Sequence, residues 1–244
     1  MSNRLRNLAC IAIMMPFLLG CPPPDRKGKT INYVFVDITG EEESSNILNG
    51  EHITQLVNSS GWGKGGDVYN GASFRLFTLS DLNMTQSLDL EMKMGETGLS
   101  GQPALARQRD VQRFINDKLK PGVSDFVSKI EKGRDESEVY SNLCKQISNL
   151  SDQPADKKNV IIYSDMLENS KLFSFYGKEV TNKEFEKAES NCKFPDLSEI
   201  NIYIVPPLNP KNKDLVLKSE KAWKNFFASK NAKSFDFDVN LNIE

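Results

Sequence analysis

The stretch that decides the fold is "NYVFVDITGEE", from Asn32 to Glu42. Its apolar run, Tyr33 to Val36, ends in the carboxylate of Asp37. The hydroxyl of Thr39 follows two positions later, and the carboxylate of Glu41 two positions after that. A continuously apolar run of this length is expected of a strand buried on both faces of a parallel sheet. At the end of such a strand, Asp37 can be a nucleophile, a metal ligand or a helix cap.

The first strand-length run as a whole covers 31–36, and further runs of this kind occur at 73–79, 159–163 and 200–205. Residues 234–241 and 86–94 alternate apolar and polar side chains, which predicts edge strands with one wet face. Helical spacing of apolar residues marks 123–130, 139–150, the aromatic group at 223–227, and 47–57. Strands that alternate with helices predict an α/β fold with a mostly parallel central sheet and helices on both faces.

The amino terminus predicts an exported protein. Two basic residues precede an apolar run from Leu8 to Leu19, which is shorter than the about 20 residues that a permanent transmembrane helix needs. The sequence Leu18 to Cys21 resembles the lipobox of bacterial lipoproteins, which implies cleavage before Cys21 and lipidation of its thiol. We therefore expect a signal peptide over 1–20, a proline-rich lipidated linker over 21–30, and a single domain over 31–244.

The implied location is the bacterial cell envelope, with the domain lipid-anchored on the extracytoplasmic side, facing the periplasm or at the outer membrane if the cell is Gram-negative. An ordinary signal peptide that contains a cysteine is the alternative. The chain has a formal net charge of −2 and no basic tract, so nucleic acid is not an expected partner. Cys144 and Cys192 remain after the linker, and they can form a disulfide in an oxidising compartment or be two small buried apolar residues.

A second strand repeats the pattern of the first, because the run 159–163 is followed by Ser164 and Asp165. Ser137 opens the helical pattern that precedes this strand. Since ligand sites of open α/β sheets lie at the carboxyl ends of the strands, Asp37, Thr39, Ser137 and Asp165 can converge there. Two carboxylates with two hydroxyls form a hard, all-oxygen site of the kind that Mg²⁺ or Mn²⁺ prefers.

The segments "VFVDITG", "ESEVYSNL" and "NVIIYSDM" resemble a von Willebrand factor A-type domain, and the resemblance extends from Ile31 to Leu241. It implies a three-layer, Rossmann-like fold and a divalent metal site whose ligands come from an Asp-x-Ser-x-Ser loop, a later threonine and a late aspartate. Asp37, Thr39, Ser137 and Asp165 match the first acid, the first serine, the threonine and the late acid. Glu41 replaces the second serine, and it can either ligate the metal or point to solvent and leave a degenerate site.

The resemblance implies non-enzymatic binding of a protein partner, whose acidic side chain takes an open coordination place on the metal. Two other accounts stay open. In one, Asp37, Thr39, Ser137 and Asp165 only cap the helices that follow them, on a metal-free scaffold. In the other, Asp37 is the nucleophile of a Mg²⁺-dependent phosphatase of the haloacid dehalogenase type, although Thr39 stands where that chemistry wants a second carboxylate.

The apolar residues after Asp165 also allow two interpretations. Leu172, Phe173, Phe175 and Tyr176 lie close together in the sequence and can contact a partner beside the strand ends, or they can be buried against the sheet.

Overall fold

The computed structural model describes residues 28–37, 48, 50–63, 66–79, 87–97, 101–130, 137–177, 179–208, 210 and 212–238. The expected signal peptide, the lipidation site Cys21 and most of the linker lie outside these residues. Thr39 and Glu41, the two expected ligands that follow Asp37, lie outside them as well. Of the expected ligands, Asp37, Ser137 and Asp165 lie within the described residues.

The protein has the predicted α/β fold, built on a six-stranded sheet with the order β3-β2-β1-β4-β5-β6. The strands are β1 (Lys29–Asp37), β2 (Gly71–Leu79), β3 (Ser87–Met92), β4 (Lys157–Tyr163), β5 (Ile200–Val205) and β6 (Ser234–Phe237). All neighbouring strands are parallel except β3, which is antiparallel to β2. The two alternating segments do form the edge strands, as predicted from their patterns.

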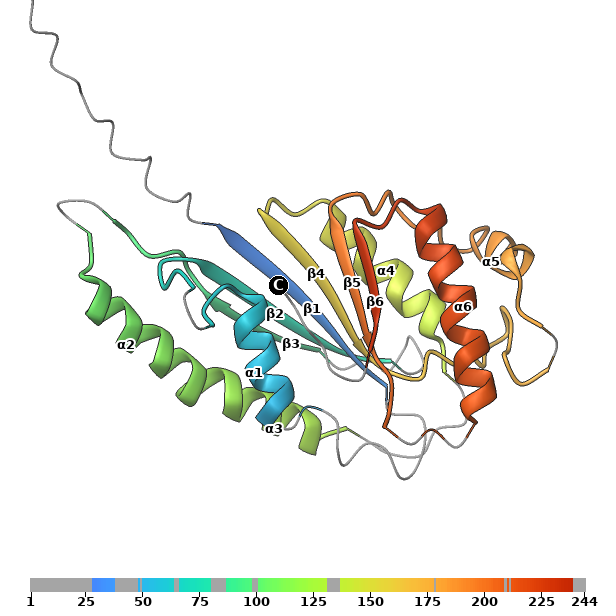
Figure 1. The fold of residues 1–244 in the computed structure, drawn as a ribbon, viewed down its shortest axis with the longest axis horizontal. Helices are drawn as coiled ribbons and strands as arrows, with labels where there is room; N and C mark the ends of the chain where they lie inside the picture. The colour runs from blue at the N-terminus through green and yellow to red at the C-terminus, as the bar shows by residue number, and fades with distance from the viewer. Residues whose placement is uncertain are drawn as a thin grey trace, which may run out of the picture.

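Helices cover both faces of the sheet, so the fold has three layers (Figure 1). The helices are α1 (Gly50–Ser59), α2 (Ala104–Phe114), α3 (Lys120–Ser128), α4 (Val139–Ser151), α5 (Asn182–Ala188) and α6 (Lys213–Ser229). Helices α1, α2 and α3 pack on one face and α4, α5 and α6 on the other, each over its own apolar core. A π-helical turn, Ile115–Leu119, joins α2 to α3. The second residue of α3, Pro121, has no backbone N–H to donate.

The core on the α4–α6 side is rich in aromatic residues. The rings of Phe185 in α5 and Phe226 in α6 stack with centroids 4.5 Å apart, and Tyr140 of α4 packs against both. Phe173 and Phe175, from the segment after Asp165, are buried in the same core, whereas Tyr176 is exposed. The phenylalanines of that segment therefore stabilise the fold and are not available to a partner.

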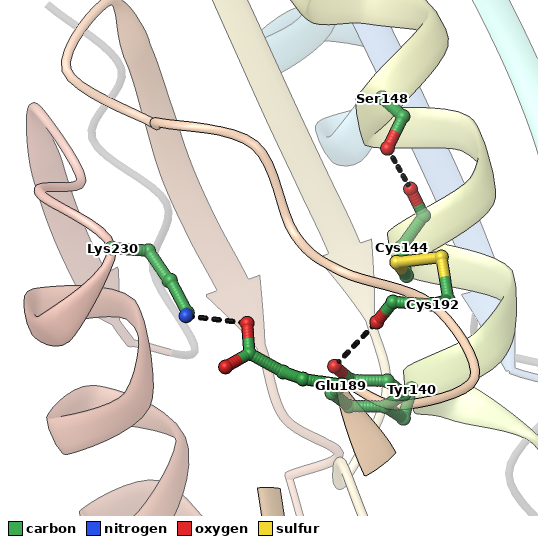
Figure 2. Close-up of a disulfide and its surroundings, with 6 residues drawn as sticks. All are labelled: Tyr140, Cys144, Ser148, Glu189, Cys192 and Lys230. Atoms are coloured by element: carbon green, nitrogen blue, oxygen red, sulfur yellow. Dashed lines mark hydrogen bonds and ion pairs between the residues drawn. A yellow bond between two sulfur atoms is a disulfide. The ribbon is translucent and has the colours of Figure 1, made fainter. Parts of the chain in front are cut away.

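A disulfide joins Cys144 of α4 to Cys192 in the segment after α5, with the two Cα atoms 6.1 Å apart (Figure 2). The hydroxyl of Tyr140 donates to the carbonyl of Cys192 at 2.8 Å, and Glu189 forms an ion pair with Lys230 nearby. The crosslink closes a loop of 48 residues, which in the chain-entropy model contributes about 4 kcal/mol to stability.

A polar ladder crosses four strands inside the sheet. Asn32, Asn159, Asn201 and Ser234 occupy matching positions on β1, β4, β5 and β6. Asn159 donates to Asn32 at 2.9 Å, Asn201 donates to Asn159 at 3.1 Å, and Ser234 donates to Asn201 at 3.0 Å. Because each buried amide is satisfied by the next strand, a shift of register would leave several of them unpaired.

Candidate functional site at the carboxyl ends of β1 and β4

Asp37, the last residue of β1, is buried, with 7% of its surface exposed. The hydroxyl of Ser164, directly after β4, donates to Asp37 Oδ2 at 2.7 Å. The same hydroxyl accepts from the backbone N–H of Met166 at 2.8 Å. Strand β1 is joined to β2 on one side and to β4 on the other, so Asp37 lies where the strand order reverses. Open α/β sheets commonly bind ligands at such a reversal, outside the carboxyl ends of the strands.

The segment after β4 is held in a strained conformation. Met166 has a φ of 59°, which is unfavourable for a residue with a side chain. Its carbonyl accepts two hydrogen bonds from α6, from Ser219 Oγ at 2.8 Å and from Trp223 Nε1 at 2.9 Å. Asp165, half-buried, accepts from the backbone N–H of Leu167 at 3.0 Å. These bonds anchor the segment that carries Asp165 against α6.

The start of α4 is capped from the same segment. Glu138 holds the N-cap position and provides no side-chain cap. Glu168 takes that role, because its Oε2 accepts from the backbone N–H of Tyr140 at 2.6 Å. Glu168 is fully buried, and burial raises the pKa of its carboxyl from 4.5 to about 8 against the lowering effect of hydrogen bonds from Ser170 and the α4 backbone.

Ser137, directly before the N-cap of α4, is a buried polar residue. Its backbone forms a two-residue bridge with Asn169, with N···O distances of 3.0 and 3.2 Å. The side chain is 2% exposed, and Ser137 Oγ has no hydrogen-bond partner among the residues that the structure describes. Buried polar atoms of this kind are uncommon and call for a specific reason, such as a bound water or ion.

The structure thus connects Asp37, Asp165 and Ser137 to one segment, residues 164–169. Asp37 accepts a hydrogen bond from Ser164, the first residue of this segment. The backbone of Ser137 pairs with that of Asn169, the last residue. The first turn of α4 lies at the same edge of the sheet as the arrowheads of the parallel strands (Figure 1). The side chains of Asp37, Asp165 and Ser137 offer oxygen atoms as ligands, and a hard divalent cation prefers such ligands.

The capping account is wrong for two of the expected residues. Ser137 does not cap α4, since its hydroxyl has no partner within the described residues. Asp165 does not begin a helix either, because the next helix, α5, starts at Asn182 behind the capping box of Thr181. Asp165 instead forms a local turn with Leu167.

The described residues do not form a cluster of acidic side chains that would by itself mark a metal site. Among the described residues, no group of three or more His, Cys, Asp or Glu side chains is arranged to hold a metal ion. Of the three carboxylates that the sequence predicts for the site, two belong to described residues, Asp37 and Asp165. Its third carboxylate, Glu41, lies outside the described residues, as does Thr39.

Sequence reasoning missed two residues of this region. Ser164 was recognised only as part of the repeated strand-end pattern, yet it is the residue that bonds to Asp37. No local pattern distinguishes Glu168, because its hydrogen bond to α4 joins residues 28 positions apart. The one histidine, His52 on α1, packs edge-on against the ring of Tyr163 at 4.8 Å, and burial lowers its pKa.

Within the part of the chain that is described, no helix combines the length and the apolar character needed to cross a membrane. No protein-family model matches the sequence, and a comparison with curated proteins found no match. Among solved structures, proximal thread matrix protein 1 from the mussel byssus is 13% identical with a TM-score of 0.34. The alignment covers 88% of this chain and 42% of that one. A similarity at this level says nothing about fold or function.

Proposed function

We propose that this protein is a lipid-anchored lipoprotein of the bacterial cell envelope whose von Willebrand A-like domain binds a protein partner without catalysing a reaction. The partner binds at the carboxyl ends of β1 and β4 through a Mg²⁺ or Mn²⁺ ion. Asp37, Ser137 and Asp165 hold the ion, with Thr39 and Glu41 as the further ligands. The observation that carries the proposal is the buried hydroxyl of Ser137, which lacks a hydrogen-bond partner among the described residues.

The free-energy cost of burying the Ser137 hydroxyl without a hydrogen bond supports a bound ion. Leaving a buried polar group unsatisfied costs about 1–3 kcal/mol, and a divalent cation would offset this by taking the oxygen as a ligand. Ser164 would act behind the ligands, because its hydrogen bond to Asp37 orients the carboxylate. A Lewis-acidic ion at this edge would leave a coordination place for a carboxylate of the partner.

The sheet topology and the disulfide support the other parts of the proposal. The antiparallel edge strand β3 and the order β3-β2-β1-β4-β5-β6 agree with a domain whose site lies between β1 and β4. The bond between Cys144 and Cys192 agrees with an oxidising compartment, and so with export to the extracytoplasmic side.

A metal-free scaffold is the second candidate, and one observation favours it. Asp37 already accepts a hydrogen bond from Ser164 at 2.7 Å, so part of its demand for a partner is met without an ion. Such a scaffold would bind a protein through its surface alone, and chelators would not change the affinity.

Calorimetric titration of MgCl₂ and MnCl₂ into the full-length protein in detergent tests the two candidates. We expect saturable one-to-one binding that is lost in Asp37→Ala and Ser137→Ala. Asp152→Ala is the matched control, because this exposed carboxylate lies at the opposite end of α4. Absence of binding in the folded wild type would support the metal-free scaffold. Binding that is unchanged in both variants would mean that the ion binds elsewhere and would contradict the proposed site.

A further inference from the structure

Helix α6 has two different faces. Its inner face is packed into the aromatic core through Val216, Trp223, Phe226 and Phe227. Its outer face exposes four lysines around one leucine, and we call these five residues the lysine face: Lys213, Leu217, Lys218, Lys221 and Lys224. Residues at spacings of three, four and seven lie on one side of a helix, so this face forms a continuous strip.

The lysines of this face have no direct charged partner among the residues that the structure describes. Within the described residues, none of the four forms an ion pair or a hydrogen bond. Other lysines do, as shown by Lys29 with Glu91 at 3.1 Å and Lys158 with Glu199 at 3.0 Å. Asp214 is exposed and stands three, four and seven residues before Leu217, Lys218 and Lys221, so this one acid lies on the same strip, whereas Glu220 is half-buried. Four lysines against these two acids still leave an excess of positive charge on α6, in a chain that is negative overall.

Exposed apolar side chains accompany the lysines at one end of the helix. Leu217 is 55% exposed, and Leu208, in the segment that leads into α6, is 75% exposed. That segment starts at the carboxyl end of β5, where the carbonyl of Val205 accepts from the backbone N–H of Ser164 at 3.2 Å. The first turn of α6 therefore lies at the same edge of the sheet as the carboxyl ends of β1 and β4 (Figure 1).

We propose that the lysine face of α6, together with Leu208, binds an acidic segment of the protein partner that carries apolar side chains. The positive charge is complementary to such a segment, and the two leucines give it an apolar contact where the helix begins. The inference deepens the proposed function, on which it rests for the assumption that the ligand is a protein, and it names the chemistry of that ligand.

An anionic membrane is the other anionic surface that lysines could meet, and the structure favours the protein. Helices that lie in a membrane interface bury a broad apolar face among the lipids. The apolar face of α6 is already buried against the sheet, which leaves Leu217 as its one large apolar side chain facing outward. One exposed leucine inserts little apolar surface into a membrane. The same side chain is large enough to fill a small pocket on a protein.

The test uses the full-length protein in detergent and a fluorescein-labelled synthetic peptide of about three heptads, with glutamates and leucines at helical spacing. Binding is measured by fluorescence anisotropy in the presence of EDTA. The variant reverses the four charges: K213E, K218E, K221E and K224E. The matched control reverses four exposed lysines elsewhere: K118E, K145E, K183E and K193E. A second variant, L208N with L217N, tests the apolar contact.

We expect the lysine-face variant to lose at least about tenfold in affinity, and the leucine variant to lose less, while the control variant stays within about twofold of the wild type. Equal loss in the lysine-face and control variants, or no binding by the wild type, would overturn the inference. So would anionic phosphatidylglycerol vesicles that bind through the lysine face when the peptide does not. Because EDTA removes divalent ions, the result does not depend on whether the metal site exists.

Discussion

The hydroxyl of Ser164 lies 2.7 Å from Oδ2 of Asp37, and this contact joins residues that are 127 positions apart in the sequence. It connects the ends of the two central strands, β1 and β4, on either side of the point where the strand order reverses. The carboxylate of Asp37 is thereby held in one orientation at the edge of the sheet. We interpret Ser164 as the residue that prepares Asp37 to bind an ion.

Replacement of Ser164 by alanine tests that interpretation. The variant removes a buried hydrogen bond to a carboxylate and also the acceptor of the Met166 N–H, so we expect a loss of about 1.5–3 kcal/mol in the free energy of unfolding. Because residues behind the ligands orient them, Mg²⁺ affinity should fall about 10- to 100-fold. Urea unfolding and calorimetry measure the two effects. An unchanged Mg²⁺ affinity in the folded variant would show that Ser164 has no part in the site.

Ser137→Ala should separate stability from metal binding. Its hydroxyl has no hydrogen-bond partner among the described residues, so without divalent ions its removal should leave the free energy of unfolding unchanged or slightly higher. Ser219→Ala is the control, because that buried hydroxyl donates to the carbonyl of Met166 at 2.8 Å, and its loss should cost about 1 kcal/mol. A clear loss of stability in Ser137→Ala in EDTA would mean that the hydroxyl has a partner after all.

Glu168 should make stability depend on pH. Its carboxyl has a pKa of about 8 in the folded protein and an ordinary value of 4.5 when unfolded. Between these pH values the folded state holds a proton that the unfolded state has released. Stability should therefore fall as the pH rises from about 4.5 to about 8, by up to about 1.4 kcal/mol per pH unit, and level off above that.

Glu168→Gln keeps the shape of the side chain and an acceptor for the Tyr140 N–H, and it removes the titration. We expect urea unfolding at several pH values to show a flatter profile for this variant, with a gain over the wild type that grows towards pH 8. Glu186→Gln, on the exposed side of α5, should reproduce the wild-type profile. If Glu168→Gln and the wild type have parallel profiles, the carboxyl of Glu168 is not held protonated by burial.

The asparagine ladder should contribute measurably to stability. Asn159→Ala removes the acceptor of Asn201 and a donor to Asn32, both buried. We expect a loss of about 2–4 kcal/mol in thermal or urea unfolding, because two hydrogen bonds and close packing are lost together. Asn149→Ala, near the exposed end of α4, is the matched control and should change stability by less than about 0.5 kcal/mol. Equal effects in the two variants would contradict a structural role for the ladder.

The sequence predicts the fold well because the apolar runs are distinctive. The runs at 31–36 and 200–205 coincide with β1 and β5 to within two residues, and the alternating segments form the two edges. The disulfide was one of two alternatives from the sequence, since only the fold brings α4 beside the segment after α5.

The contacts of the site were less predictable for a physical reason. Local patterns indicate where a strand ends, and so they indicated Asp37 and Asp165. The bond from Ser164 to Asp37 and the cap that Glu168 provides for α4 both depend on how distant segments meet. Asn32, Asn159 and Asn201 each stand within or beside an apolar run, and those polar residues at matching strand positions were a pattern from which the ladder could have been inferred.

The most direct test of the metal site is an anomalous difference map from crystals of the full-length protein grown with MnCl₂. We predict a peak within about 2 Å of a carboxylate oxygen of Asp37 and of Ser137 Oγ, with no such peak in crystals of Asp37→Ala. A well-ordered site at this edge of the sheet that shows no anomalous peak at saturating Mn²⁺ would contradict the account and leave Asp37 as a structural partner of Ser164.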